Sequence, residues 1–146
     1  MAKDKSKKTN LKSSYNSGNI NYPVGDFLIR LKNACLAQRK TVSVKQSNLI
    51  NEVANTLQKE GYLDEVKKKD NYLEVRLRYA KKEPVLTNVI LVSKPGLRIY
   101  KTREDIENLR GPQILIISSS HGVMSSRDAL KKGVGGEVIA EILWIS

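Results

Sequence analysis

The sequence is poor in the residues that build redox and metal chemistry. Its 146 residues include one cysteine and one histidine. A single cysteine, Cys35, excludes an internal disulfide and fits a reducing compartment. One Cys and one His cannot supply a Cys/His zinc site. We therefore expect no metal and no cofactor.

Enzyme motifs and membrane segments are also missing. The sequence has no G-x-S-x-G elbow and no G-x-x-x-x-G-K-[ST] phosphate loop. Ser120 and His121 are the one Ser–His candidate, and adjacent residues rarely orient as nucleophile and base. No apolar run approaches the ~20 residues that a membrane span needs, and residues 1–22 lack the apolar segment of a secretory signal. We therefore expect a cytoplasmic protein that is not an enzyme.

Positive charge is what the sequence has in excess, with a formal net charge of +11. Residues 1–46 hold ten Lys/Arg against two acids, and residues 47–146 hold 16 against 13. A one-sided excess of this size attracts polyanions. Nucleic acid is therefore the favoured partner, and an anionic membrane surface is second.

Residues 1–22 carry much of this charge. They hold five lysines and one aspartate in a setting rich in Ser and Asn. Such a segment cannot bury enough apolar surface to offset its ordering entropy, so we expect a disordered basic arm. The arm by itself supports a rival function, a basic polyanion-binding or membrane-peripheral adaptor.

Residues 23–82 have the pattern of a small α/β domain of order α-β-α-β-β. Pro23 suits the first turn of one helix, and Ser47 suits the cap of a second. Strands are expected over Thr41–Lys45, Tyr62–Lys67 and Tyr72–Tyr79. Apolar residues at helical or alternating spacing are expected to point inward: Val24, Phe27, Leu28, Leu31, Cys35, Leu49, Ile50, Val53, Leu57, Leu73, Val75 and Leu77.

The Lys81-Lys82-Glu83-Pro84 stretch interrupts this pattern, and we place a domain boundary there. Residues 83–146 are then expected to form a C-terminal, β-rich domain with short helices. Each half has about 60 residues, which is marginal for independent folding, so the two should pack together. The expected fold class is α+β, with two small packed domains.

The segment from Ser118 to Glu137, S-S-S-H-G-V-M-S-S-R-D-A-L-K-K-G-V-G-G-E, is the most informative one. A strand over Ile114–Ile117 runs into three hydroxyls, the histidine and a glycine. A short polar helix, a second Gly-rich turn and an apolar strand follow. Two loops rich in small donors suit close approach to a nucleic-acid backbone or base edge. The glycines are expected to form turns with positive φ: Gly122, Gly133, Gly135 and Gly136.

These motifs carry a resemblance. G-V-M-S-S-R-D-A and G-V-G-G-E resemble the C-terminal signature of the bacterial family of small ribosomal subunit protein eight. Three further stretches agree in order and spacing: P-V-G-D-F-L-I-R-L-K-N-A, S-N-L-I-N-E-V-A-N-T-L-Q-K-E-G-Y-L and S-K-P-G-L-R-I-Y-K. The resemblance spans roughly residues 23–144.

The resemblance implies a role for the serine loop. In the family this loop, usually Ser-Thr-Ser, inserts into the minor groove of a distorted ribosomal RNA stem and reads a base by hydroxyl contacts. Ser118 and Ser120 match, and Ser119 keeps the hydroxyl of the threonine that it replaces but not its methyl. His121 stands where the family usually has lysine, so the resemblance does not carry a permanent phosphate contact over to it, although the imidazole can still stack or hydrogen-bond.

The resemblance extends this surface to other residues. Gly122 and the Gly135-Gly136-Glu137 turn would lie against the RNA, with Glu137 orienting the serine hydroxyls or a ribose 2′-OH. Arg30 and Asn33 lie on the exposed face of the first helix, which in the family also touches RNA. A further cluster interleaves cations with an aromatic, which suits RNA because bases stack on aromatics and cations hold the backbone: Lys94, Arg98, Tyr100 and Lys101.

The function that follows is that of a structural constituent of the small ribosomal subunit. The resemblance implies binding to a central-domain stem of small-subunit ribosomal RNA, in support of subunit assembly and translation. The implied partners are that RNA and neighbouring small-subunit ribosomal proteins, and the implied location is the cytoplasmic ribosome. Because the family includes translational repressors that bind a messenger mimic of the stem, the protein's own messenger RNA is an open candidate partner.

Overall fold

The computed structural model describes residues 22–111 and 113–144. The expected basic arm, except for Tyr22, lies outside the described residues. The helices and strands of the described chain come in this order: α1 (Pro23–Leu36), β1 (Thr41–Lys45), α2 (Asn48–Lys59), β2 (Leu63–Lys69), β3 (Tyr72–Leu77), β4 (Tyr79–Ala80), β5 (Glu83–Pro84), β6 (Leu86–Leu91), β7 (Tyr100–Lys101), α3 (Arg103–Glu107), β8 (Ile114–Ser119), β9 (Gly122–Ser125), α4 (Ser126–Lys132) and β10 (Gly136–Trp144).

The first two helices begin where their sequences predict. Pro23 opens α1, and Tyr22 precedes it as the N-cap residue. Ser47 caps α2, its Oγ accepting a hydrogen bond from the N–H of Ile50 at 3.3 Å. The expected inward faces are buried except at Leu49, which is 39% exposed. That expectation was wrong because the buried stripe of α2 runs through Ile50 and its helical neighbours, and Leu49 lies one position to the side.

An antiparallel sheet of order β1-β3-β2 completes the N-terminal half. The turn between β2 and β3 contains Asp70, whose φ of 48° is one that Asp tolerates better than most residues. Leu73, Val75 and Leu77 are buried as expected. The second strand of the hairpin ends at Leu77, and Tyr79–Ala80 pairs instead with Glu83–Pro84 as a separate short ladder.

The C-terminal half is a five-stranded sheet of order β6-β10-β8-β9, with β7 also paired to β10. The sequence predicted a loop from the serines to the following helix, and the structure places β9 there. This expectation was wrong because Gly122–Ser125 extends and pairs with β8, from Ser119↔Gly122 to Ile116↔Ser125. A four-residue strand flanked by glycine and serines has little periodicity to distinguish it from a loop.

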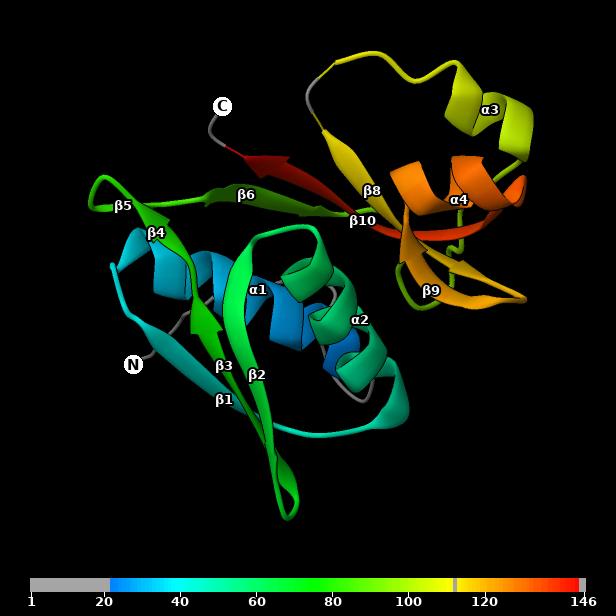
Figure 1. Cartoon of the computed structure of the whole chain (residues 1–146). Coiled ribbons are helices and arrows are strands. Elements are labelled where there is room, and N and C mark those ends of the chain that lie inside the picture. The colour runs from blue at the N-terminus through cyan, green and yellow to red at the C-terminus, as the bar shows by residue number, and fades with distance from the viewer. Residues whose placement is uncertain (1–21, 112, 145–146) are drawn as a thin grey trace, which may run out of the picture.

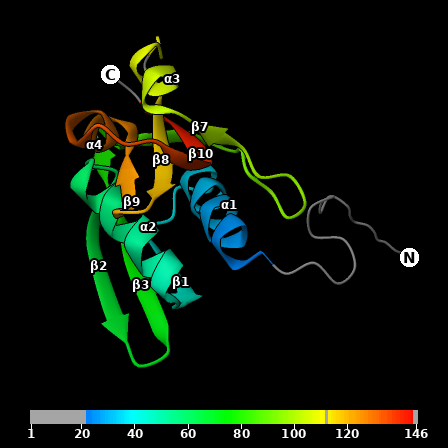
Figure 2. The ribbon, with the colours of Figure 1, turned by 90° about the vertical axis from the view of Figure 1, so that its right-hand side faces the viewer.

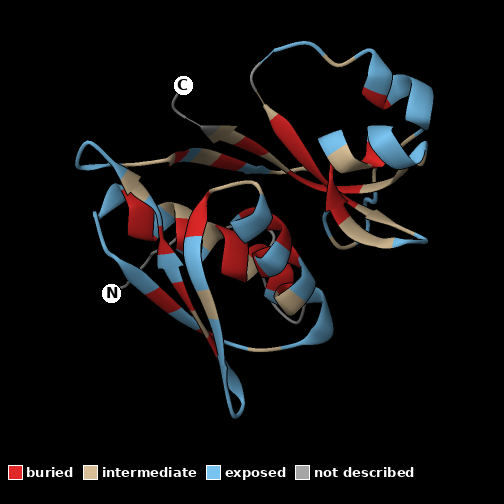
Figure 3. Cartoon of the chain, viewed as in Figure 1, coloured by how far each residue is buried: buried red, intermediate tan, exposed pale blue. Residues whose placement is uncertain are grey.

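The helices lie in two places relative to the sheets (Figure 1). Helices α1 and α2 lie between the two sheets, and α3 and α4 cover the other face of the C-terminal sheet. The buried strands and helix faces form continuous internal surfaces, whereas the tip of the β2–β3 hairpin is exposed (Figure 3). The α+β class is therefore confirmed.

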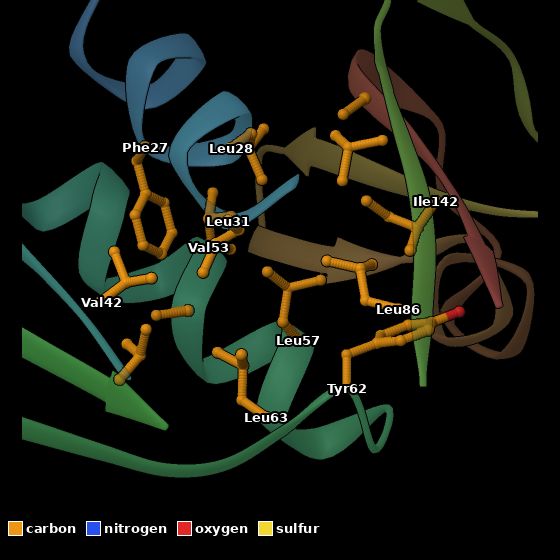
Figure 4. Close-up of a cluster of buried hydrophobic side chains, with 14 of the residues drawn as sticks. Phe27, Leu28, Leu31, Val42, Val53, Leu57, Tyr62, Leu63, Leu86 and Ile142 are labelled. Carbon is orange, nitrogen blue, oxygen red and sulfur yellow. The ribbon is translucent and has the colours of Figure 1, made fainter. Parts of the chain in front are cut away.

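One apolar core joins the two halves (Figure 4). Phe27, Leu31 and Leu57 from the helices pack in the same cluster as Leu86 and Ile142 from the C-terminal sheet. Burying such side chains supplies about 1.5–3 kcal/mol each. A smaller cluster around Ile106, Leu115 and Ile117 lies under α3 and α4. The division into domains at residues 82–83 stays a prediction.

Candidate nucleic-acid interface

The serine loop is the turn of the β8–β9 hairpin, with Ser120 and His121 at its tip. Gly122 follows with a φ of 106°, which a residue with a side chain rarely adopts. The Oγ of Ser119 accepts a hydrogen bond from the N–H of His121 and donates one to the carbonyl of Gly122, both at 3.0 Å. Ser119 therefore holds the shape of the turn in the free protein.

The other hydroxyls of the triplet remain available. Ser118 is half-buried and Ser120 is exposed, and neither side chain makes a hydrogen bond to another described residue. His121 is exposed beside them. The hairpin thus offers the hydroxyls of Ser118 and Ser120 as two unused donor–acceptor groups, on a backbone whose shape is fixed by Ser119.

The Gly-Gly pair is needed for close approach and not for turning. Only Gly122 and Gly133 of the four glycines have positive φ, so the expectation for Gly135 and Gly136 was wrong. A Cβ on Gly135 would lie 2.3 Å from the carbonyl oxygen of Lys101, and one on Gly136 would lie 2.3 Å from that of Ser118. These glycines let β7 and β8 approach the beginning of β10.

This close approach aligns three candidate residues in one row across the sheet. Glu137 of β10 pairs with Ser118 of β8 on one side and with Tyr100 of β7 on the other. Directly opposed residues in antiparallel strands project from the same face. Figure 2 shows β7, β10 and β8 side by side at this end of the sheet. Ser118, Glu137 and Tyr100, more than 15 residues apart in sequence, therefore share a surface.

The basic cluster of Lys94, Arg98 and Lys101 borders this row, but one of its cations is already in an ion pair. The Nη1 of Arg98 donates to the Oε2 of Glu137 at 2.9 Å, and this hydrogen bond raises the pKa of the guanidinium. The Glu137 side chain makes no hydrogen bond to a serine side chain of the described residues. Lys94 and Tyr100 are exposed, and the Tyr100 side chain is 67% exposed. The aromatic surface is thus open for stacking, whereas one cation is already paired.

Arg30 and Asn33 lie elsewhere. They line an open hollow of about 400 Å³ between α1 and β1. Sequence reasoning missed three polar residues that share this hollow, although the alternation of β1 places two of them on its exposed side: Arg39, Thr41 and Ser43. The structure therefore does not join Arg30 and Asn33 to the serine hairpin but places them at a second polar surface.

Helix α2 fixes the serine hairpin through contacts that sequence reasoning also missed. Glu52 Oε1 accepts from the N–H of Val123 at 3.1 Å, and Thr56 Oγ1 donates to its carbonyl at 3.3 Å. Ser125 Oγ donates to Glu60 Oε2 at 2.6 Å. The exposed edge of β9 is thus held by side chains from the N-terminal half, and no local pattern in the sequence could have revealed it.

No group of three or more His, Cys, Asp or Glu side chains in the described residues could hold a metal ion. None of the helices in residues 22–111 and 113–144 combines the length and apolar character needed to cross a membrane.

The fold and this surface define a class: an α+β protein with a rigid hydroxyl-bearing hairpin, an exposed tyrosine and nearby cations on one sheet. Comparison with known proteins agrees. The family model described as Ribosomal protein S8 matches residues 22–144. The chain belongs to this family.

Several curated relatives share one name. The small ribosomal subunit protein uS8 of Streptococcus uberis is 41% identical over 126 residues, covering 82% of this chain and 96% of the relative. The protein of the same name from Synechococcus sp. is 40% identical over 127 residues, with the same shares covered. That of Streptococcus pneumoniae is 41% identical over 126 residues, again with 82% and 96% covered.

Proposed function

We propose that this chain is a structural, non-enzymatic constituent of the small ribosomal subunit that binds an irregular stem in the central domain of small-subunit ribosomal RNA. The observation that carries the proposal is the row Ser118–Glu137–Tyr100, built on a hairpin whose shape is fixed by Ser119. Family membership and the names of the relatives support it.

The serine hairpin supplies the specific contact. The hydroxyls of Ser118 and Ser120 can each donate and accept, which suits base edges and ribose 2′-OH groups in a wide, shallow RNA minor groove. Gly122 keeps the turn slim enough to enter the groove, and Tyr100 offers a surface for an unstacked base worth ~1–3 kcal/mol. A regular duplex has no unstacked base to offer, so the arrangement favours an irregular stem.

The cations supply affinity without sequence preference. Lys101 follows the tyrosine in β7 and Lys94 lies in the preceding turn, and the α1–β1 hollow carries Arg30 and Arg39 beside Asn33. Each neutralised phosphate releases counterions, which makes binding depend on salt. The hollow lies apart from the hairpin and would receive a different segment of the same RNA or of its surroundings.

Assembly and location follow from this role. Binding would stabilise the stem early in subunit assembly, next to neighbouring small-subunit ribosomal proteins, on cytoplasmic ribosomes. The protein's own messenger RNA would bind only where it folds into the same irregular shape. The rival function, a polyanion-binding or membrane-peripheral adaptor, rests on residues 1–22, and the described surface gives it no specific site.

The decisive experiment compares affinities for the irregular stem and for a regularised duplex of equal length at two salt concentrations. The variant is the double substitution Ser118→Ala and Ser120→Ala, which leaves the hydrogen bonds of Ser119 intact. Thr87→Ala, which removes an exposed hydroxyl of β6 outside both candidate surfaces, is the matched control. We expect a preference for the irregular stem that the double variant loses and the control keeps. Equal, salt-sensitive binding of both RNAs by the native protein would leave only a polyanion binder.

A further inference from the structure

Tyr22 connects the beginning of α1 with the candidate interface. Its ring is buried, 8% exposed, and its hydroxyl donates to the carbonyl of Ser93 at 2.9 Å. Ser93 is itself fully buried, and its Oγ accepts from the N–H of Ile99 at 2.9 Å. Tyr22 is thus attached to the base of the loop that carries Lys94 and Arg98.

That loop is closed by backbone hydrogen bonds. Lys94 and Leu97 exchange two backbone hydrogen bonds of 2.9 Å around Pro95 and Gly96. The φ of Gly96 is 84°, so the turn has proline and glycine where a type II turn needs them. The position of the loop therefore depends on the contacts that hold its two ends. The hydrogen bond from Tyr22 to Ser93 is one of these contacts.

The ring also supports a charged group of the interface. The Cζ of Arg98 lies 5.9 Å from the centroid of the Tyr22 ring, within cation–π range. From this position over the Tyr22 ring, Arg98 forms its ion pair with Glu137, the central residue of the Ser118–Glu137–Tyr100 row. The side chain of Glu137 is only 17% exposed. The burial of Tyr22, more than any nearby charge, raises the pKa of its phenol, so the ring is neutral at physiological pH.

A glycine in α1 provides the space in which the Tyr22 ring lies. Gly25 lies inside the helix with ordinary helical φ, a place where glycine is unfavourable. A Cβ at Gly25 would lie 2.4 Å from Cδ2 of Tyr22 and 2.8 Å from Cε2. The missing side chain of Gly25 leaves the space that the ring occupies.

We propose that Tyr22 is a positioning residue of the RNA interface, which seats Arg98 on Glu137 and thereby sharpens the preference for irregular RNA. The inference rests on the proposed function and deepens it. While Tyr22 holds Arg98 in place, Glu137 neutralises the Arg98 charge. The Ser118–Glu137–Tyr100 row then contacts RNA through the serine hydroxyls and the face of the tyrosine ring. With Arg98 released, a mobile cation can pair with the phosphates of any duplex, and a partly buried carboxylate is left beside the serines.

The test uses full-length protein with the irregular stem and with the regularised duplex of equal length. Tyr22→Leu keeps apolar bulk but removes the aromatic face, and Tyr22→Phe keeps the face but loses the hydrogen bond to Ser93. Both are made in the native background and with Arg98→Ala. We expect Tyr22→Leu to lower the ratio of the two affinities by about two- to fivefold, as a cation–π contact at a partly exposed site implies, and Tyr22→Phe to retain it. With Arg98→Ala present, Tyr22→Leu should change nothing further.

A second measurement needs no RNA. Solvent exchange of the Arg98 guanidinium protons, followed by NMR, should speed up in Tyr22→Leu and stay slow in Tyr22→Phe. Gly25→Ala, which pushes the ring from its seat, should reproduce the faster exchange. A drop in selectivity of the same size with and without Arg98, or no drop together with unchanged exchange, would overturn the inference. A native protein without any preference between the RNAs would instead remove the proposed function.

Discussion

Gly136 lies directly against the carbonyl of Ser118, so that any Cβ at position 136 would come within 2.3 Å of that oxygen. This contact sets how closely β10 approaches β8, and with it the distance between Glu137 and the serine hairpin. The serine loop and the Gly-Gly-Glu turn, which are separate in the sequence, form one surface because position 136 has no side chain.

Gly136→Ala should therefore destabilise the protein and disturb the interface together. Inserting a methyl into a well-packed site costs about 1–3 kcal/mol, which urea unfolding would measure. Gly61→Ala is the control, because Gly61 has a φ of 93° but a Cβ there would meet only the end of the Arg78 side chain, at an ordinary contact distance of 3.5 Å. It should lose stability from its backbone conformation alone and keep the preference for irregular RNA. Native stability in Gly136→Ala would show that the strands separate without cost.

Ser119→Ala should loosen the hairpin even without RNA. The substitution removes the two 3.0 Å hydrogen bonds that close the turn, and a typical hydrogen bond contributes about 0.5–1.5 kcal/mol. Hydrogen exchange of the amides of His121 and Gly122 should accelerate. Ser120→Ala removes an exposed hydroxyl and should leave exchange unchanged. If both variants behave alike, the turn does not depend on the Ser119 hydroxyl.

Ser125→Ala should weaken the attachment of β9 to α2. Ser125 is fully buried, donates to Glu60 at 2.6 Å and accepts from the N–H of Asp128 at the start of α4. Loss of a helix cap costs ~1 kcal/mol, and a buried acceptor left without its donor costs about 1–3 kcal/mol. A lower thermal midpoint is expected, with Thr87→Ala on the exposed side of β6 as the control. An unchanged midpoint would mean that another donor replaces Ser125.

Cys35 should make stability depend on alkaline pH. Burial raises the pKa of its thiol from 9.0 to about 11, so the folded state keeps the proton that the unfolded state releases. The contribution is complete below pH 9 and is lost as pH rises toward 11. Urea midpoints of native protein and Cys35→Ala, measured from pH 8 to pH 10, should converge as pH rises. Parallel curves would contradict the assignment.

The sequence by itself determined much of the local structure. Pro23 and Ser47 marked helix starts because a fixed φ and a capping hydroxyl act within one turn. The apolar spacing of α1 and of β3 identified their buried faces, since helix and strand periods depend only on the chain's own geometry. The serine and glycine motifs indicated the candidate surface through their resemblance to a known family, and its contact with RNA stays a proposal.

Tertiary structure decided how these pieces meet. The strand β9, the close approach at Gly135 and Gly136, and the pairing of Arg98 with Glu137 all join residues that lie far from one another or lack a local pattern. Their geometry depends on strand register and on packing between the halves, which long-range contacts specify and local propensity does not. Tyr22 is the clearest case, because composition placed it in a basic arm and a hydrogen bond to Ser93, 71 residues away, buried it.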